Sequence, residues 1–96
     1  MAKFLPFTDL RMKEVTIYTQ ALCGYCTAAK RLLERKGAQF TEIDVTYDPK
    51  ERAAMRERTG GRNSTPQIFI GDTHVGGCDD LYALDERGGL DPLLGD

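Results

Sequence analysis

Two cysteines separated by a Gly-Tyr pair, Cys23 and Cys26, are the residues of this chain best suited to redox chemistry. They follow a strand predicted over residues 14–19 and open a helix predicted over residues 24–36. A thiolate at a helix N-terminus faces free backbone N–H groups and the positive end of the helix dipole, which lower its pKa. Cys23 is therefore predicted to attack a disulfide, and Cys26, one turn along the same helix face, to resolve the mixed disulfide that forms.

A second candidate site is the run of residues 76–80, two glycines followed by a cysteine and two aspartates. The glycines let a ligand approach the backbone closely, and the N-terminus of a helix predicted over residues 79–87 offers N–H groups to an anion. A ligand with both a carboxylate and an ammonium group would fit, with the ammonium on an aspartate. The aspartates also have an ordinary interpretation as the N-cap and first-turn acids of that helix, and both interpretations can hold.

Pro66 follows Thr65 and directly precedes a strand predicted over residues 67–70. Proline has no backbone N–H to donate to a neighbouring strand, so the start of a strand is an ordinary place for it. Most peptide bonds that precede a proline are trans. The residues alone therefore favour an ordinary trans proline at this position.

A zinc site made from Cys23, Cys26, His74 and Cys78 is a further possibility, because three cysteines and one histidine form a common tetrahedral set. The chain has a complete hydrophobic pattern, however, and needs no metal to fold. We expect no metal here, with His74 half-exposed on a strand and Cys78 a small buried side chain.

The elements that must position these residues alternate along the chain. Hydrophobic periodicity predicts strands over residues 14–19, 40–45, 67–70 and 73–75 and helices over residues 24–36, 49–59 and 79–87. The order is β-α-β-α-β-β-α, which predicts an α/β fold with one mixed four-stranded sheet flanked by helices. The first half is a βαβ unit with parallel strands, the second half is a hairpin with a helix, and residues 90–96 are expected to be a short tail.

Length and composition narrow the functional classes. The 96 residues suit one domain over residues 14–96, preceded by a tail over residues 1–13 that lacks periodicity. Thirteen Lys and Arg against fifteen Asp and Glu disfavour binding to nucleic acid. The chain has no apolar stretch long enough to span a membrane, and three cysteines do not suit a secreted disulfide framework, so we expect a cytoplasmic protein.

Three motifs, in their order and spacing, resemble those of the small bacterial dithiol glutaredoxins: I-Y-T before C-G-Y-C, then T-P-Q-I-F-I, then G-G-C-D-D-L-Y-A-L. The resemblance extends over about residues 15–94. It implies a thioredoxin-like fold and the glutathione-dependent reduction of glutathione mixed disulfides and protein disulfides. Glutathione would be the co-substrate, and a monomer would act on glutathionylated or disulfide-containing proteins. The resemblance also implies that the bond before Pro66 is cis.

The resemblance assigns roles to matching residues. Cys23 and Cys26 match the nucleophile and the resolving thiol. The residues that match glutathione-binding positions are Tyr25, Thr65, Pro66, Gly77, Cys78 and Asp79. Tyr25 would flank the glutathione groove, and the backbone of residues 65–66 would pair with the cysteinyl part of glutathione. Residues 77–79 would hold the γ-glutamyl end, Cys78 mainly through its backbone N–H.

Four positions depart from the family's usual pattern. Gln20 replaces a lysine three residues before the nucleophile, which removes a cation expected near both the thiolate and the glycyl carboxylate of glutathione. Thr65 replaces a valine, a change that a backbone role can survive. The loop at residues 60–62 looks one residue longer than usual, and Arg62 is a candidate for the glycyl carboxylate. Gly24 replaces the commoner proline.

Gly24 keeps a second function open. Some glutaredoxins with a small residue in place of that proline share one [2Fe–2S] cluster between two chains, held by the nucleophilic cysteine of each chain and two glutathiones. Cys23 would be that ligand here. A thioredoxin-like reductant supplied by a reductase is a third interpretation, which the run of residues 76–80 disfavours because it suits glutathione.

Overall fold

Strands β1 (Val15–Thr19) and β2 (Phe40–Asp44) run parallel, and helix α2 (Gly24–Arg35) connects them. They form the first half of the computed structural model, which describes residues 13–95. Strand β3 (Gln67–Ile70) pairs antiparallel with β1, and β4 (Thr73–Gly76) pairs antiparallel with β3. The strand order β2-β1-β3-β4 confirms the predicted mixed four-stranded sheet.

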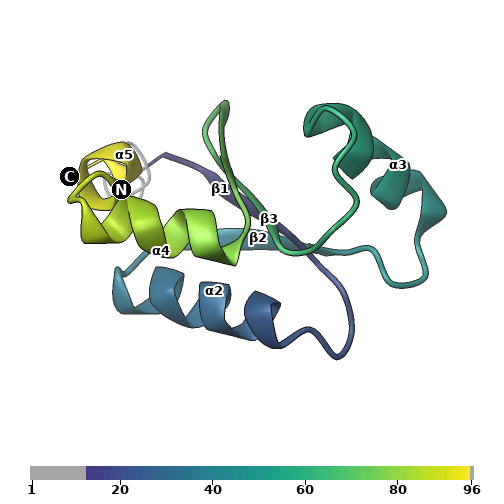
Figure 1. Ribbon diagram of the computed structural model, residues 1–96, viewed down its shortest axis with the longest axis horizontal. Helices are drawn as coiled ribbons and strands as arrows, with labels where there is room; N and C mark the ends of the chain where they lie inside the picture. The colour runs from purple at the N-terminus through teal and green to yellow at the C-terminus, as the bar shows by residue number, and fades with distance from the viewer. Residues whose placement is uncertain (1–12, 96) are drawn as a thin grey trace, which may run out of the picture.

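Helices cover both faces of this sheet. Figure 1 shows α2 and α4 (Cys78–Glu86) together on one side of the strands, and α3 (Pro49–Arg58) apart from them at the other end of β2. The alternation of side chains along β1 explains the two layers. Ile17 packs in the cluster shared with α2 and α4, whereas its neighbour Tyr18 packs in the cluster shared with α3.

Helix α3 packs thinly, as its polar sequence predicts. Met55 is its one fully buried residue, at 0% exposure, and it contacts Tyr18, Val45 and Phe69. The start of the helix is set locally, because the Asp48 side chain accepts a hydrogen bond from the third residue of the first turn and a proline occupies the first position.

The prediction of a tail over residues 90–96 was wrong. Residues Leu90–Leu94 form a short helix, α5, whose two terminal leucines lie in the main core at 0% and 2% exposure. Lys36, at the end of α2, bonds to Asp85 of α4 at 2.7 Å and to Asp91 of α5 at 3.0 Å, which ties the three helices together. A single turn carries too short a periodic pattern to be recognised in the sequence.

The predicted N-terminal tail lies almost wholly outside the described residues. Lys13, the first of them, donates its backbone N–H to the Leu94 carbonyl at 3.1 Å. No helix within residues 13–95 is both long enough and apolar enough to cross a bilayer. Across the same residues, no group of three or more His, Cys, Asp or Glu side chains is arranged to hold a metal ion.

Candidate active site

Cys23 is the N-cap residue of α2. Its backbone is extended, and its Sγ accepts a hydrogen bond from the Cys26 backbone N–H at 3.1 Å. The sulfur thus occupies the place that a Ser or Asp oxygen takes at an ordinary N-cap, facing the free N–H groups of the first turn. Leu22, just before it, has a φ of 57° and a fully exposed side chain, so the loop turns sharply to deliver Cys23 to the helix.

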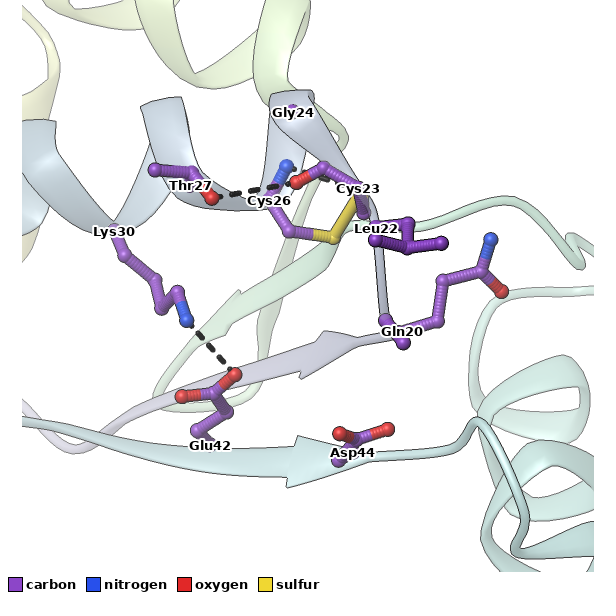
Figure 2. Close-up of a pocket in the computed structure, with 10 residues that line it drawn as sticks. Gln20, Leu22, Cys23, Gly24, Cys26, Thr27, Lys30, Glu42 and Asp44 are labelled. Atoms are coloured by element: carbon purple, nitrogen blue, oxygen red, sulfur yellow. Dashed lines mark hydrogen bonds and ion pairs between the residues drawn. A yellow bond between two sulfur atoms is a disulfide. The ribbon is translucent and has the colours of Figure 1, made fainter.

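Cys23 and Cys26 form a disulfide with a Cα–Cα distance of 5.2 Å (Figure 2). This distance lies in the ordinary range for bridged cysteines, so the helix places the two thiols for exchange without backbone movement. Cys23 is half-buried and Cys26 is 2% exposed. An incoming disulfide can therefore reach Cys23 first, which agrees with the roles inferred from the sequence.

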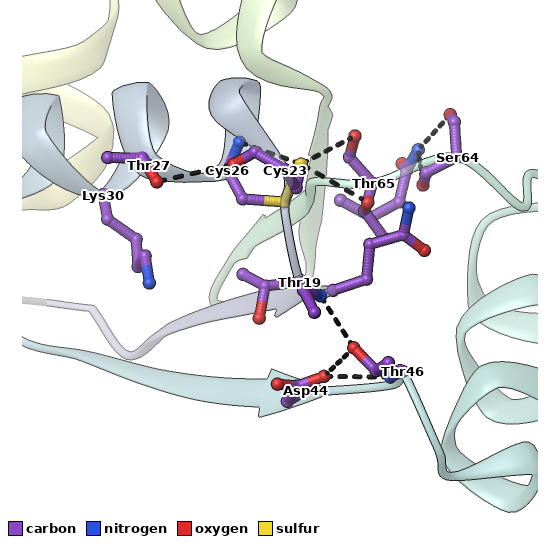
Figure 3. The surroundings of a disulfide bond; sticks show 12 residues. Thr19, Cys23, Cys26, Thr27, Lys30, Asp44, Thr46, Ser64 and Thr65 are labelled. Carbon is purple, nitrogen blue, oxygen red and sulfur yellow. Dashed lines mark hydrogen bonds between the residues drawn. A yellow bond between two sulfur atoms is a disulfide. The ribbon is translucent and has the colours of Figure 1, made fainter.

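The loop before β3 lies directly against the nucleophile candidate. The Thr65–Pro66 peptide bond is cis, as the resemblance implied. The Thr65 carbonyl oxygen lies 3.7 Å from Cys23 Sγ, and the Thr65 hydroxyl donates to the same sulfur at 3.6 Å (Figure 3). The resemblance implies a backbone role for this residue, and the hydroxyl contact could not be predicted, because nothing local to residue 65 shows which way its side chain turns.

The glycine-rich run joins this loop. Helix α4 begins at Cys78 with Gly77 as its N-cap, and the Asp80 carboxylate accepts from the Gly77 N–H at 2.9 Å. A Cβ on Gly77 would lie 3.5 Å from the Pro66 carbonyl oxygen, so the two loops touch. Asp80 is thus the capping acid, whereas Asp79 is exposed and, within the described residues, makes no side-chain hydrogen bond.

Cys78 is 8% exposed and unpaired. Burial, with a smaller contribution from the neighbouring Asp79, raises the pKa of its thiol above the ordinary value. The thiol therefore stays protonated at neutral pH. This confirms the prediction of a small buried side chain and leaves the Cys78 backbone N–H as the group that can serve a ligand.

Two arginines contact the segments around the active-site loops. Arg62, the sequence-based candidate for the glycyl carboxylate, has its Nη2 3.8 Å from the Asp80 carboxylate, at the start of α4. Arg52 of α3 donates to Gln20 Oε1 at 2.8 Å and to both oxygens of Asn63, the carbonyl at 3.3 Å and the side-chain Oδ1 at 3.1 Å. Sequence reasoning missed Arg52, because no local pattern connects α3 with the loop before Cys23.

A polar cavity of about 470 Å³ opens beside the disulfide (Figure 2). Cys23 and Cys26 line one side of it, and Lys30, Glu42 and Asp44 line the other. Lys30 Nζ lies 3.0 Å from Glu42 Oε2. A hydrogen bond from the Thr19 hydroxyl, and next the bond from Lys30, hold the pKa of Glu42 below its ordinary value. The cavity therefore contains an ion pair rather than a free cation.

Tyr25 stands on the first turn of α2 with 67% of its surface exposed. The ring lies two residues after the half-buried Cys23 and is open to a ligand. The flanking role that the resemblance implies for Tyr25 stays a prediction.

A cysteine pair at the N-terminus of the first helix, facing a cis-proline loop in a thioredoxin-like fold, defines a thiol–disulfide oxidoreductase. The glutaredoxin family model matches residues 15–75, and the chain belongs to the glutaredoxin family. It is a member of the small bacterial type, with the Cys23–Cys26 pair in the expected place.

Two bacterial relatives cover nearly the whole domain. Glutaredoxin 3 of Escherichia coli (strain K12) is 54% identical over 83 residues, which are 86% of this chain and 99% of that protein. The solution structure of glutaredoxin from Brucella melitensis is 60% identical with a TM-score of 0.78, over 88% of this chain and 91% of that one. A crystal structure of a buckwheat glutaredoxin–glutathione complex is 31% identical with a TM-score of 0.75, over 83% of this chain and 74% of that one.

Proposed function

We propose that this chain reduces glutathione mixed disulfides and protein disulfides, with glutathione as co-substrate and Cys23 as the nucleophile. The observation that carries the proposal is the position of Cys23 Sγ, which caps α2 and accepts from the Cys26 N–H at 3.1 Å. A hydrogen bond to a thiolate from a backbone N–H, added to the helix dipole, favours the ionised form that attacks disulfides.

The proposed reaction on a mixed disulfide has two exchanges. The Cys23 thiolate attacks the glutathione sulfur, a bond forms between these two sulfurs, and the substrate thiol leaves as a thiolate that takes a proton from water. The thiolate of a second glutathione then attacks the sulfur of the bound glutathione. Oxidised glutathione leaves, and the Cys23 thiolate is restored. In the net reaction the mixed disulfide is reduced to the substrate thiol, and one disulfide, that of oxidised glutathione, takes its place.

Reduction of a protein disulfide uses the second thiol. Cys23 forms a mixed disulfide with the protein, and Cys26, 5.2 Å away between Cα atoms, attacks Cys23 Sγ and releases the reduced protein. The Cys23–Cys26 disulfide that results is reduced by two glutathiones. A monomer in a cytosol that holds a reduced glutathione pool would suffice for this cycle.

The groups around Cys23 suit the three parts of glutathione. We propose that residues 77–79 hold the γ-glutamyl end: its carboxylate takes the N–H groups of Cys78 and Asp79 at the start of α4, and the Asp79 side chain takes its ammonium group. The backbone of Thr65, before Pro66, pairs with the cysteinyl part, and Tyr25 covers one side of the groove. The glutathione complex of the buckwheat relative supports this ligand for the family.

Arg52 is the group that we propose for the glycyl carboxylate of glutathione. Its guanidinium is bonded to neutral oxygens of Gln20 and Asn63 rather than to a carboxylate, so its charge is available to an anion. Arg62 already faces the Asp80 carboxylate, at the start of α4. Gln20 then acts by orienting Arg52, and the lysine that the family usually has at position 20 is replaced by a cation from α3.

A coupled assay tests the proposal. Glutathione, glutathione reductase and NADPH are combined with a glutathionylated peptide, and NADPH oxidation is followed. We expect turnover that depends on this protein and is lost in Cys23→Ser. Turnover with NADPH and thioredoxin reductase instead of glutathione would contradict the proposal and favour a thioredoxin-like reductant.

A glutathione-ligated [2Fe–2S] cluster shared by two chains is the second candidate function. One observation favours it: Gly24 stands where proline is commoner in the family, and a Cβ at this position would meet no heavy atom within 4 Å, so the exposed start of α2 beside Cys23 is left open. Anaerobic reconstitution with iron, sulfide and glutathione, followed by visible spectroscopy and size-exclusion chromatography, tests it. A coloured dimer would support the cluster, and a colourless monomer would contradict it.

A further inference from the structure

We propose that the Thr65 hydroxyl is a catalytic group that donates a hydrogen bond to the Cys23 thiolate and lowers its pKa. The inference rests on the assignment of Cys23 as the nucleophile under the proposed function. Thr65 stands directly before the cis bond to Pro66, where the resemblance leads one to expect valine. Valine has nearly the shape of threonine but no hydrogen-bond donor, so the substitution adds a donor without changing the volume of the loop.

The contact is direct. Thr65 Oγ1 lies 3.6 Å from Cys23 Sγ, a distance suited to a hydrogen bond to sulfur, whose radius exceeds that of oxygen. Figure 3 shows the hydroxyl and the carbonyl of Thr65 both turned toward this sulfur. Within residues 13–95 the hydroxyl makes no other side-chain hydrogen bond, so its proton is available to the sulfur.

The two oxygens of Thr65 act on Cys23 in opposite senses. The carbonyl oxygen, 3.7 Å from Sγ, can accept a hydrogen bond from the thiol, which favours the neutral form. The hydroxyl donates, as does the Cys26 backbone N–H at 3.1 Å, and both favour the thiolate. Loss of the hydroxyl would leave the carbonyl opposed by a single donor, so the pKa of Cys23 would rise.

Charged side chains near the sulfur are already paired or bonded. On the cavity side, Lys30 of α2 is paired with Glu42 of β2, and Asp44 adds a further negative charge. Gln20 also lines this cavity, and Arg52 of α3 donates a hydrogen bond to its side chain.

Two acids at the start of α4 lie near the site, and one cation from the loop before β3 lies beside them. Arg62 faces Asp80 at 3.8 Å, and Asp79 is exposed beside them. Within residues 13–95 the groups that donate hydrogen bonds to Cys23 Sγ are neutral, namely the Cys26 N–H and the Thr65 hydroxyl. Short-range hydrogen bonds are screened by salt much less than a cation would be.

The experiment compares Thr65→Val with Thr65→Ser, both in a Cys26→Ser background that leaves Cys23 unable to form the internal disulfide. The rate of iodoacetamide alkylation is measured from pH 4 to pH 10, and peptide mass spectrometry separates Cys23 from the buried Cys78. We expect Thr65→Val to raise the pKa of Cys23 by about half a unit to one unit, and Thr65→Ser to stay near the parent protein. The rise should persist in high salt.

Three outcomes would overturn the proposal: an unchanged pKa in Thr65→Val, an equal rise in Thr65→Ser, or a rise that vanishes in high salt. Thermal melting of each variant shows that the comparison is made between folded proteins. The alkylation test needs no glutathione, so it separates this proposal from the function proposed above. A pKa shift in a protein without glutathione-dependent turnover would support the hydroxyl's role and contradict that function, whereas normal turnover without a shift would contradict the hydroxyl's role alone.

Discussion

Arg52 Nη2 donates to Gln20 Oε1 at 2.8 Å, which joins α3 to the loop that carries the nucleophile. On sequence alone, Gln20→Lys is expected to lower the pKa of Cys23 and to tighten glutathione binding, because one new cation would serve two anions. The contact changes this expectation, since a lysine at position 20 would stand against a guanidinium that is already there. The two cations would repel each other at this distance, so either the new lysine or the Arg52 guanidinium would have to move away.

Arg52→Gln should therefore weaken glutathione binding. A charge-assisted hydrogen bond is worth about 1.5–3 kcal/mol, and partial exposure reduces this, so we expect the KM for glutathione to rise about 3- to 30-fold. Lys50→Gln is the matched control, because Lys50 is an exposed cation on the same helix. An equal rise in KM in both variants would indicate a general effect of charge, and no rise in Arg52→Gln would remove Arg52 from the site.

Gln20→Lys should rescue the Arg52→Gln variant. With the guanidinium gone, the lysine has room beside the loop and can take the glycyl carboxylate, so the KM should return toward that of the parent protein. In the parent protein the same substitution should have little effect or raise the KM. Tightening of glutathione binding by Gln20→Lys in the presence of Arg52 would show that the two cations act independently. Steady-state kinetics of all four proteins form the double-mutant cycle.

Substitution of Cys23 and substitution of Cys26 should affect the two kinds of substrate differently. Cys23→Ser is expected to abolish turnover of every disulfide, because Cys26 is 2% exposed and cannot replace it. Cys26→Ser should keep the reduction of glutathionylated peptides, which needs one thiol and glutathione, and should lose the reduction of protein disulfides that need a resolving thiol. The coupled glutathione reductase assay is run with both substrates. Loss of peptide deglutathionylation in Cys26→Ser would contradict the assigned roles.

Asp79→Asn should raise the KM for glutathione by about 10- to 150-fold if its carboxylate meets the γ-glutamyl ammonium. The alkylation rate of Cys23 should change much less, because this carboxylate makes no contact with the sulfur. Glu86→Gln, at the far end of the same helix, is the control. Asp80 is unsuited to this purpose, since its carboxylate caps α4 through Gly77. A normal KM in Asp79→Asn would exclude the carboxylate from the site.

Much of the fold follows from local patterns in the sequence. The order of the strands and helices depends on alternation, on helical spacing and on caps such as Asp48, all of which are properties of neighbouring residues. The same holds for Cys23, whose place at the start of α2 follows from the strand before it and the apolar stripe after it. The α5 helix was not predicted, because its leucines are buried only against the surface that α2 and α4 supply, and nothing in the neighbouring sequence shows this.

Contacts between residues that are far apart in the sequence form the part of the site that local patterns did not predict. Arg52 and Gln20 are 32 residues apart, and Thr65 and Cys23 are 42 residues apart. Loop geometry decides whether such side chains meet, and the sequence carries no periodic signal of it. Arg62 is a sequence-based candidate for the glycyl carboxylate because of its place in the loop at residues 60–62, and the sequence does not show that its Nη2 lies 3.8 Å from the Asp80 carboxylate.

His74 connects the edge of the sheet with the loop that faces Cys23. Its Nε2 lies 2.8 Å from Gln67 Oε1, and the Gln67 side chain, at 0% exposure, donates to the Ser64 carbonyl at 3.0 Å. The imidazole also stacks on Phe69, with 4.8 Å between ring centres. Burial lowers the pKa of His74 below its ordinary value of 6.5, and the charge of Arg62 adds to this effect.

The lowered pKa makes the free energy of unfolding depend on pH. Above pH 6.5 the imidazole is neutral in both states and has no effect. Below that value the unfolded chain takes up a proton that the folded protein resists, so stability falls, and the loss is complete once the pH is below the folded pKa. His74 is the chain's one histidine, and the carboxylates with lowered pKa, Glu42 and Asp44, lose their contribution at lower pH.

Urea unfolding at pH 8 and pH 5.5 tests this dependence in the parent protein and in His74→Gln, which keeps a donor for Gln67 but does not titrate. We expect the parent protein to lose stability between the two values and the variant to lose clearly less. His74→Phe supplies the contrast: it keeps the stacking on Phe69 but leaves Gln67 Oε1 unpaired, which should cost about 1–3 kcal/mol at either pH. If His74→Gln lost as much stability as the parent protein on acidification, the proton would be taken up elsewhere and His74 would have no part in the effect.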